Sequence, residues 1–124
     1  MFAGNHDLNN LVAIVDNNNL QIDGHVSDVN DVQPLAAKFE AFKWHVIQVN
    51  GHDVRAVRAA LQEAVAYSAG PVVIIAKTIK GKGVSFMEDK ASWHGNAPSA
   101  EQAAEALAEI DAAGGQLAAA VKGE

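Results

Sequence analysis

Three short apolar runs, each bordered by turn-forming residues, constrain the fold of this chain most strongly. The runs are rich in β-branched residues, which is typical of strands buried on both faces of a parallel sheet. They are Leu11–Val15, Val46–Val49 and Val72–Ala76. Asp and Asn after the first run, Asn-Gly after the second and Gly-Pro before the third favour turns at their borders. The pattern therefore predicts three strands, each buried on both faces.

Two segments between these runs have helical periodicity, because their apolar residues recur at spacings of three or four. The residues concerned are Leu35, Phe39 and Phe42 within Pro34–Phe42, and Val54, Val57, Leu61 and Val65 in the second segment. Strands that alternate with helices imply parallel strands joined by crossover helices. The sequence therefore predicts an α/β fold of three layers, α/β/α, with a parallel sheet.

Capping residues predict where helices begin and end. Asp53 is placed to cap the second helix, and Gly70-Pro71 stops it. A Ser-x-x-Gln capping box at Ser99 opens a third helix over about Ala100–Ala113. We assign residues 1–113 to one partial domain and residues 114–124 to an Ala/Gly-rich tail that frays or forms a loosely held helix.

The predicted sheet is expected to be incomplete at its N-terminal side. The first apolar run begins only about ten residues after Met1, and three fully apolar strands need neighbours at their edges and cover on their faces. We therefore expect the upstream part of the domain to be missing.

The composition excludes several classes of function. A net charge of −6 with nine Lys and Arg lacks the basic stripe that nucleic acid demands. Without cysteine, the chain has no disulfides and no thiolate metal site. The sequence starts with no secretory leader, and no apolar run reaches the roughly 18 residues of a membrane span. We expect a cytoplasmic protein with neither nucleic acid nor membrane as partner.

Ligands in open α/β sheets bind beyond the carboxyl ends of the strands, so the residues after each run are candidates for a site. After the first run, Asp16–Gly24 concentrates oxygen donors of the kind that Mg²⁺ prefers in sites shared with phosphate. The same residue types also form turns for conformational reasons alone. Composition leaves both interpretations of this loop open.

Two further segments are candidates. Lys77–Gly83 combines glycines, which permit close approach of a ligand, with lysines that can meet phosphate, although it matches no Walker or dinucleotide motif. His94 lies between Trp93 and Gly95 and could donate a hydrogen bond or carry a proton. The alternatives are a solvated basic loop for Lys77–Gly83 and a merely structural or solvent-exposed histidine for His94. The other histidines, which have no metal-ligand spacing, are His6, His25, His45 and His52.

Taken in this order, the three loop segments resemble the transketolase family. They are Leu11–Gly24, with its Asp-Asn-Asn-Asn stretch, Lys77–Gly83, and Glu88–Gly95, which reads Glu-Asp-Lys-Ala-Ser-Trp-His-Gly. With Phe39–Trp44 included, the likeness runs from Met1 to about Ile110. It implies a thiamine-diphosphate-binding domain of an enzyme that transfers two-carbon ketol units between ketose and aldose phosphates.

The resemblance also implies residue roles at the metal. The family holds the diphosphate of its cofactor through Mg²⁺, with Ca²⁺ or Mn²⁺ as alternative ions. Carried over by position, the side chain of Asn18 and the backbone carbonyl of Leu20 are the metal ligands. These donors are neutral, so an acidic chain can bind a diphosphate through the ion.

Four further residues are implied to contact the cofactor. Ile22 and Ile79 would lie against thiamine diphosphate, and Lys80 matches a position that contacts it. His94 matches a histidine that reaches the diphosphate and the donor substrate, which makes it the candidate catalytic residue.

The chain departs from the family pattern in one important respect. The family pairs its Asn-Asn loop with an upstream Gly-Asp-Gly, whose aspartate is a charged metal ligand, and this sequence contains no Gly-Asp-Gly. Met1-Phe2-Ala3 resembles the end of the helix that follows that motif. The pyrimidine-binding domain, whose glutamate activates the cofactor across a dimer interface in the family, is also missing. We expect the chain to be inactive alone and to work in a homo- or hetero-oligomer.

Two alternatives remain. A non-catalytic interaction module could keep the fold and pair through an exposed sheet edge. A fragment of the α subunit of a 2-oxo acid dehydrogenase would share the Asn-Asn loop, but the Glu88–Gly95 segment disfavours it.

Overall fold

The computed structural model describes residues 1–122, with side chains through Gly114. The chain forms two compact units, one made of Met1–Asn19 with Val26–Thr78, and the other of Leu20–His25 with the residues from Ile79 onward. Of the predicted tail, residues 123 and 124 lie outside the described residues.

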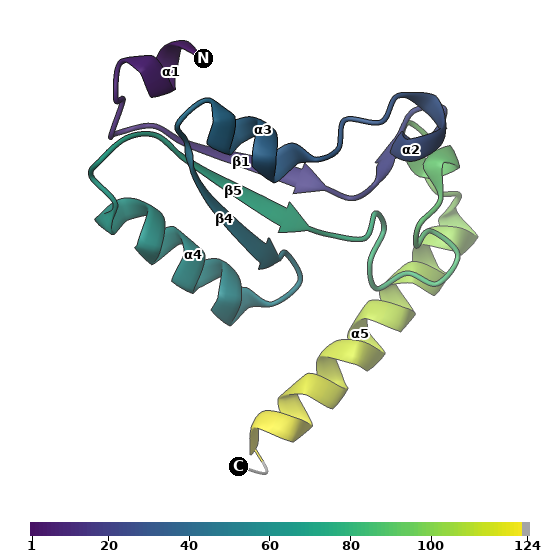
Figure 1. The fold of residues 1–124 in the computed structure, drawn as a ribbon. Coiled ribbons are helices and arrows are strands. Elements are labelled where there is room, and N and C mark those ends of the chain that lie inside the picture. The colour runs from purple at the N-terminus through teal and green to yellow at the C-terminus, as the bar shows by residue number, and fades with distance from the viewer. Residues whose placement is uncertain (123–124) are drawn as a thin grey trace. The chain divides into compact units, whose positions relative to one another are not determined.

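The first unit contains the main sheet and its helices (Figure 1). Its elements are α1 (Phe2–Asn5), β1 (Val12–Asn17), α2 (Val26–Val29), α3 (Leu35–Ala41), β4 (His45–Asn50), α4 (Val54–Ala66) and β5 (Val72–Lys77). The second unit contains β2 (Leu20–Gln21), β3 (Gly24–His25), the 3₁₀ helix η1 (Ala91–Trp93) and α5 (Ala100–Lys122). The three long strands and three of the helices occur in the predicted segments, and the α/β class is confirmed. Asp16 and Asn17, which the sequence predicts in the loop after the first strand, are the last residues of β1, and Lys77 is the last residue of β5.

The three strands of the first unit form a parallel sheet in the order β1-β5-β4. Val72 pairs with Val12 on one side and His45 on the other. The register continues to Lys77 at the carboxyl end, so all three strands end level, with their arrowheads side by side (Figure 1). The central strand β5 buries four consecutive residues, Val72 to Ile75, so both of its faces are covered.

The edge strand β1 differs from its prediction. Its residues alternate between exposed and half-buried, so the expected burial on both faces is wrong for this strand. The physical reason is its position, because β1 pairs with β5 alone and α4 packs mainly on β4 and β5. The expectation is also wrong for the other edge strand, β4, in which Ile47 alone is buried and Gln48 is exposed.

Helix α4 is fixed at its start by the predicted cap. The Asp53 carboxylate accepts hydrogen bonds from the backbone N–H groups of Arg55 at 2.9 Å and Ala56 at 3.1 Å. These N–H groups have no partner inside the helix, so the side chain replaces the missing acceptor. The predicted N-cap is confirmed.

The buried face of α4 is not the predicted apolar stripe. Ala60 and Ala64 are buried against Ile47, Val72 and Ile74, whereas most of the predicted stripe faces solvent. The buried face is thus displaced by one residue, or about 100° around the helix. Alanine at the contact lets the helix approach the sheet closely, which leaves the larger Leu61 and Val65 outside.

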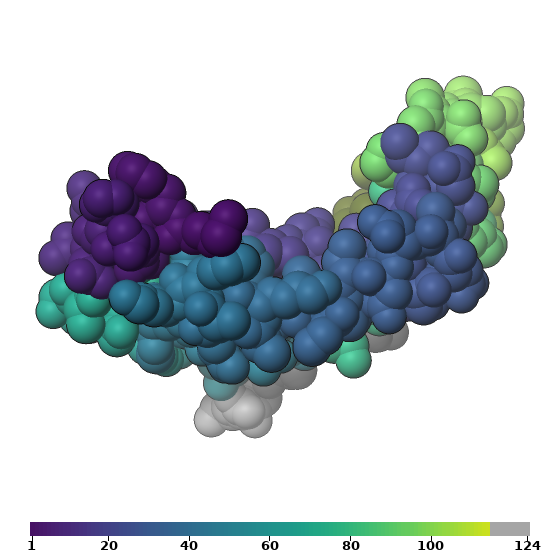
Figure 2. All heavy atoms as spheres, turned by 45° about the horizontal axis from the view of Figure 1, so that its top comes forward, coloured from purple at the N-terminus to yellow at the C-terminus, as the bar shows by residue number. Residues whose placement is uncertain are grey.

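The N-terminal helix α1 packs against the chain after α3. Gly4 is buried, and a Cβ built there would lie 1.7 Å from the carbonyl oxygen of Phe42. Figure 2 shows the N-terminal segment, in purple, seated against residues of this region, in blue. This close backbone contact requires glycine.

Helix α5 begins as predicted but ends later. The Ser99 N–H donates to the side-chain oxygen of Gln102 at 2.9 Å, and the Gln102 N–H donates to the Ser99 hydroxyl at 3.2 Å, which confirms the capping box. The predicted end at Ala113 is wrong, because α5 continues to Lys122. The alanines beyond Gly115 have high helix propensity and outweigh the cost of the two glycines. No helix of the described residues is long and apolar enough to cross a membrane.

Replacing Asp53 with alanine should destabilise the first unit by about 1 kcal/mol, because two backbone donors lose their acceptor. Asp53→Asn keeps a side-chain oxygen and should lose much less. Urea unfolding followed by circular dichroism measures both changes. Equal stability of the alanine variant and the wild type would contradict the capping role.

Candidate functional site

The carboxyl ends of the three parallel strands are tied together by hydrogen bonds. The Thr78 N–H donates to the Asn17 carbonyl at 3.3 Å, and the Thr78 hydroxyl donates to the Asp16 carboxylate. Gly51 follows β4, and its N–H donates to the Lys77 carbonyl at 2.8 Å. The segments that leave β1 and β5 therefore start side by side at one edge of the sheet.

The first of the two predicted metal ligands, Asn18, directly follows β1. Asn18 is half-buried and follows the last residue of the strand, and Asn19 adopts a left-handed conformation with φ of 61°. The Val26 N–H donates to the Asn19 carbonyl at 2.9 Å, and this hydrogen bond joins the two ends of the segment 19–26. Asn19 therefore has the conformation that the turn interpretation predicts. Asn18 lies between the end of β1 and this bend.

The second unit contains the other five predicted site residues. Leu20 is half-buried in β2, which pairs with β3 in a short antiparallel hairpin, and Ile22 is exposed at the turn of that hairpin. Ile79 is exposed and Lys80 is half-buried. The Asp89 N–H donates to the Lys80 carbonyl at 2.9 Å, so the backbone of Lys80 is held by the loop that follows.

The glycine-rich segment after Lys80 folds back on itself. Gly81 and Gly83 have φ of 70° and 95°, a region that other residues enter only with strain. A Cβ at Gly81 would lie 2.7 Å from the Met87 carbonyl oxygen, whereas a Cβ at Gly83 would meet open space. Glu88 accepts from the Gly83 N–H at 2.9 Å and forms an ion pair with Lys82 at 3.1 Å. The turn is thus closed by its own residues, and the space beside the Cα of Gly83 is open.

His94 lies on a segment anchored by its tryptophan neighbour. The Trp93 indole N–H donates to the Phe86 carbonyl at 3.0 Å, and the two rings are 5.5 Å apart. The His94 N–H donates to the Ala91 carbonyl at 2.9 Å, and the residue is exposed. Trp93 therefore fixes the backbone while His94 faces solvent. Phe86 gave no signal in the sequence, because its role depends on this fold-back.

Glu109 links the same loop to α5. Its carboxylate accepts from the Ser85 N–H and from the Ser85 hydroxyl, both at 2.6 Å. The Ser85 hydroxyl, followed by the backbone N–H, lowers the pKa of Glu109 below the usual 4.5. Sequence reasoning missed this contact because the two residues are far apart in the chain.

The donor chemistry fits part of a magnesium diphosphate site. Asn18 offers an amide oxygen and Leu20 a carbonyl, which are hard neutral ligands suited to Mg²⁺. Across the part of the chain that the structure describes, no three His, Cys, Asp or Glu side chains gather where they could hold a metal ion. The carboxylate of Asp16 is engaged by Thr78.

Comparison with known proteins agrees with this fold. The family described as "Transketolase, thiamine diphosphate binding domain" matches residues 1–112. The 6-deoxy-6-sulfo-D-fructose transketolase subunit of Clostridium sp. (strain MSTE9) is 39% identical over 92% of this chain and 42% of its own. An apulose-4-phosphate transketolase subunit of Phocaeicola vulgatus is 39% identical over 87% of this chain and 39% of its own.

Solved structures give the same result. The transketolase of Campylobacter jejuni superposes with a TM-score of 0.83 and 33% identity over 89% of this chain. A Pichia stipitis transketolase in complex with sedoheptulose 7-phosphate superposes with a TM-score of 0.81 and 26% identity.

The chain belongs to the transketolase family, within its thiamine-diphosphate-binding domain. It spans about two fifths of the two bacterial relatives and about one sixth of these solved transketolases. The expected identity as part of this domain is confirmed. The roles of the six site residues stay predictions.

Acid should loosen the contact between Ser85 and Glu109. A carboxyl with a depressed pKa stabilises the folded state above its unfolded pKa, and this stabilisation is lost as pH falls from about 4.5 through the lower folded value. NMR titration of the Ser85 amide should therefore show a midpoint below 4.5. In Glu109→Gln this transition should disappear. A midpoint at or above 4.5 would contradict the charge-assisted contact.

Proposed function

We propose that this chain contributes the Asn-Asn half of a Mg²⁺ and thiamine diphosphate site for two-carbon ketol transfer between sugar phosphates. The observation that supports this proposal most is the level ending of β1 and β5. Asn18 follows one strand, and Ile79 and Lys80 follow the other. Loops at the carboxyl ends of adjacent parallel strands are where such sheets bind ligands.

The residues have complementary tasks in this proposal. Asn18, through its side-chain oxygen, and Leu20, through its carbonyl, would hold the ion, and the ion would supply positive charge for the diphosphate. Ile22 and Ile79 would offer apolar surface to the cofactor, and Lys80 would place a positive charge near it. Thiamine diphosphate, when bound, supplies the electron sink for breaking and forming the carbon–carbon bond.

His94 has the role closest to the substrate in this proposal. Its imidazole would donate a hydrogen bond to a substrate oxygen or to the diphosphate, which orients the reacting sugar. Its exposure is consistent with access from solvent, and Trp93 holds its backbone in place. Ketose and aldose phosphates are the substrate class that we assign.

We call the part of the site that this chain is proposed to supply, with Asn18 and Leu20 as its metal ligands, the half-site. It has a consequence for activity. Two neutral ligands bind a divalent ion weakly, so the chain alone should be inactive. The relatives that match most of this chain carry about three fifths of their length outside the matched stretch. We assign the missing charged ligand and the activating glutamate to such additional polypeptide, in a homo- or hetero-oligomer.

A non-catalytic interaction module is the second candidate. The exposed apolar side chains of β1 support it, because they suit contact with another protein. The family match favours transketolase over the 2-oxo acid dehydrogenase alternative.

Replacing Asn18 with alanine should lower the affinity for thiamine diphosphate in the presence of Mg²⁺ by about 10- to 100-fold, the usual loss when a metal site is disturbed. Asn10→Ala makes the same chemical change at an exposed position before β1 and should have no effect. Isothermal titration calorimetry at matched Mg²⁺ measures both.

Two outcomes would count against the proposed site. Measurable binding that is equal in the Asn18 and Asn10 variants would remove the metal-ligand assignment. Tight binding of thiamine diphosphate by the wild-type chain alone would contradict the half-site.

A further inference from the structure

Thr78 contacts each of the three strand ends at the carboxyl edge of the sheet. It is the only threonine in the chain, and it follows the last residue of β5. Its backbone N–H donates to the Asn17 carbonyl at 3.3 Å, and its hydroxyl donates to the Asp16 carboxylate. A Cβ built on Gly51 would lie 2.5 Å from the Thr78 methyl carbon, so this methyl lies against the residue that follows β4. A single residue therefore joins the ends of β1, β5 and β4.

The strand register explains how one side chain reaches both neighbours. Ala76 of β5 pairs with Asp16 of β1 and with Val49 of β4. Thr78 lies two residues beyond Ala76, and residues two apart on an extended chain share a face with each other and with their paired neighbours. The two branches of the Thr78 side chain then act separately, the hydroxyl on β1 and the methyl at the end of β4. Serine lacks the methyl, and valine lacks the hydroxyl.

The two hydrogen bonds from Thr78 act on the residues directly before Asn18. The Asn17 carbonyl belongs to the planar peptide unit that contains the Asn18 nitrogen. Holding this carbonyl fixes the plane from which Asn18 leaves the strand, and holding Asp16 fixes the residue before that plane. On its other side, Asn18 is followed by the left-handed bend at Asn19. The backbone orientation of Asn18 therefore depends on the contacts of Thr78 with β1.

We propose that Thr78 is a positioning residue of the half-site, because it orients the metal ligand Asn18 through the end of β1. This inference rests on the proposed function, in which Asn18 is assigned to the ion. Residues that orient a metal ligand without touching the metal commonly contribute strongly to metal affinity, because a misdirected ligand binds the ion poorly. In this role the Asp16 carboxylate serves as an acceptor for Thr78 and not as a ligand of the ion.

Two substitutions separate the two branches of the Thr78 side chain. Thr78→Val keeps the shape and the methyl but removes the hydroxyl, whereas Thr78→Ser keeps the hydroxyl. In the 124-residue chain without metal or cofactor, the NMR order parameter of the Asn18 backbone N–H reports motion of the peptide unit that Thr78 holds. We expect a value of about 0.85 in the wild type and in Thr78→Ser, and a fall toward about 0.6 in Thr78→Val.

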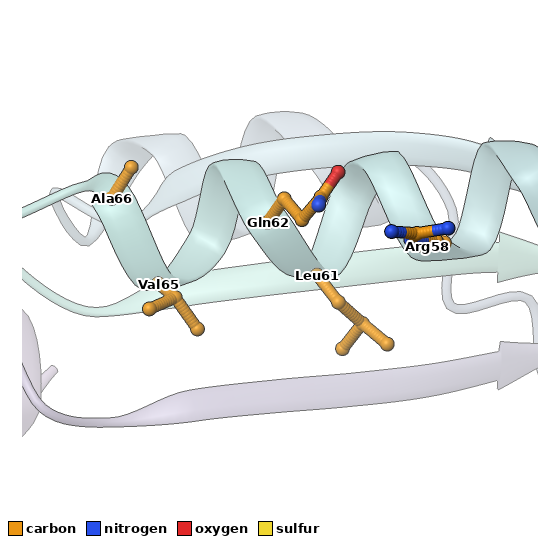
Figure 3. A pocket seen from close by; sticks show the side chains of 5 residues that line it. All are labelled: Arg58, Leu61, Gln62, Val65 and Ala66. Carbon is orange, nitrogen blue, oxygen red and sulfur yellow. The ribbon is translucent and has the colours of Figure 1, made fainter.

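Leu61→Ala controls for a general loss of stability in the same unit. Leu61 lines a hollow of about 380 Å³ whose lining residues all belong to α4, and Figure 3 shows it among them. It is 41% exposed, so its truncation removes part of its buried apolar surface and should lower the urea midpoint. Because no residue of this lining lies at the carboxyl edge of the sheet, we expect Leu61→Ala to leave the order parameter of Asn18 unchanged.

Binding of thiamine diphosphate in the presence of Mg²⁺ tests the link to the half-site. NMR titration at matched Mg²⁺ suits the weak affinity expected of this chain. We expect Thr78→Val to lower the affinity about tenfold, and Thr78→Ser and Leu61→Ala to keep the wild-type value. In the Asn18→Ala background, Thr78→Val should cause no further loss, because the effects of residues that act through one ligand are not additive.

Four outcomes would overturn the positioning role. They are an Asn18 order parameter that Thr78→Val leaves unchanged, equal effects of the valine and serine variants, the same effect from Leu61→Ala, or a further loss of affinity in the Asn18→Ala background.

Failure of the proposed function gives a different result. A fall in the Asn18 order parameter in Thr78→Val, with no magnesium-dependent binding by the wild-type chain, would overturn the proposed function while leaving Thr78 as the residue that orients Asn18. Binding that depends on Asn18 but not on Thr78 would do the reverse.

Discussion

The pairing of β1 and β4 with the central strand β5 is the interaction on which the rest of the first unit depends. β5 buries four consecutive aliphatic or β-branched residues, and the register aligns the ends of its neighbours with Lys77. Parallel pairing brings the loops after β1 and β5 to one edge, where hydrogen bonds from Thr78 join them. Strand register therefore makes the segments after β1 and β5 start from neighbouring positions, although they are far apart in the sequence.

Much of this fold could be predicted from local sequence signals, because apolar runs, Asp53 and the Ser99 capping box act within a few residues. Predictions of which residues are buried were wrong where burial depends on tertiary packing. Periodicity identified α4 as amphipathic, but it could not show that Ala60 and Ala64, with their small side chains, would contact the sheet in place of Leu61 and Val65. An apolar run likewise could not show that β1 lies at an edge.

The candidate site was predicted from the order of three motifs along the chain and from their resemblance to a known family, with little contribution from geometry. The positions of Asn18 after β1 and of Lys80 after β5 follow from the strands, whereas the Ser85–Glu109 and Trp93–Phe86 contacts require the folded loop. The two donors that the proposal assigns to the ion, the Asn18 amide oxygen and the Leu20 carbonyl, are neutral, so under the proposed function the ion's charge would be balanced mainly by the phosphate.

Paramagnetic relaxation with Mn²⁺ in place of Mg²⁺ tests the central claim most directly, because Mn²⁺ broadens the NMR signals of nuclei close to it. In the presence of thiamine diphosphate, substoichiometric Mn²⁺ should broaden the side-chain amide of Asn18 and the backbone amides next to Leu20 first. Broadening that begins instead at the acidic positions Asp28 and Asp31 or at Glu101 and Glu105 of α5, with Asn18 unaffected, would contradict a metal site at the end of β1.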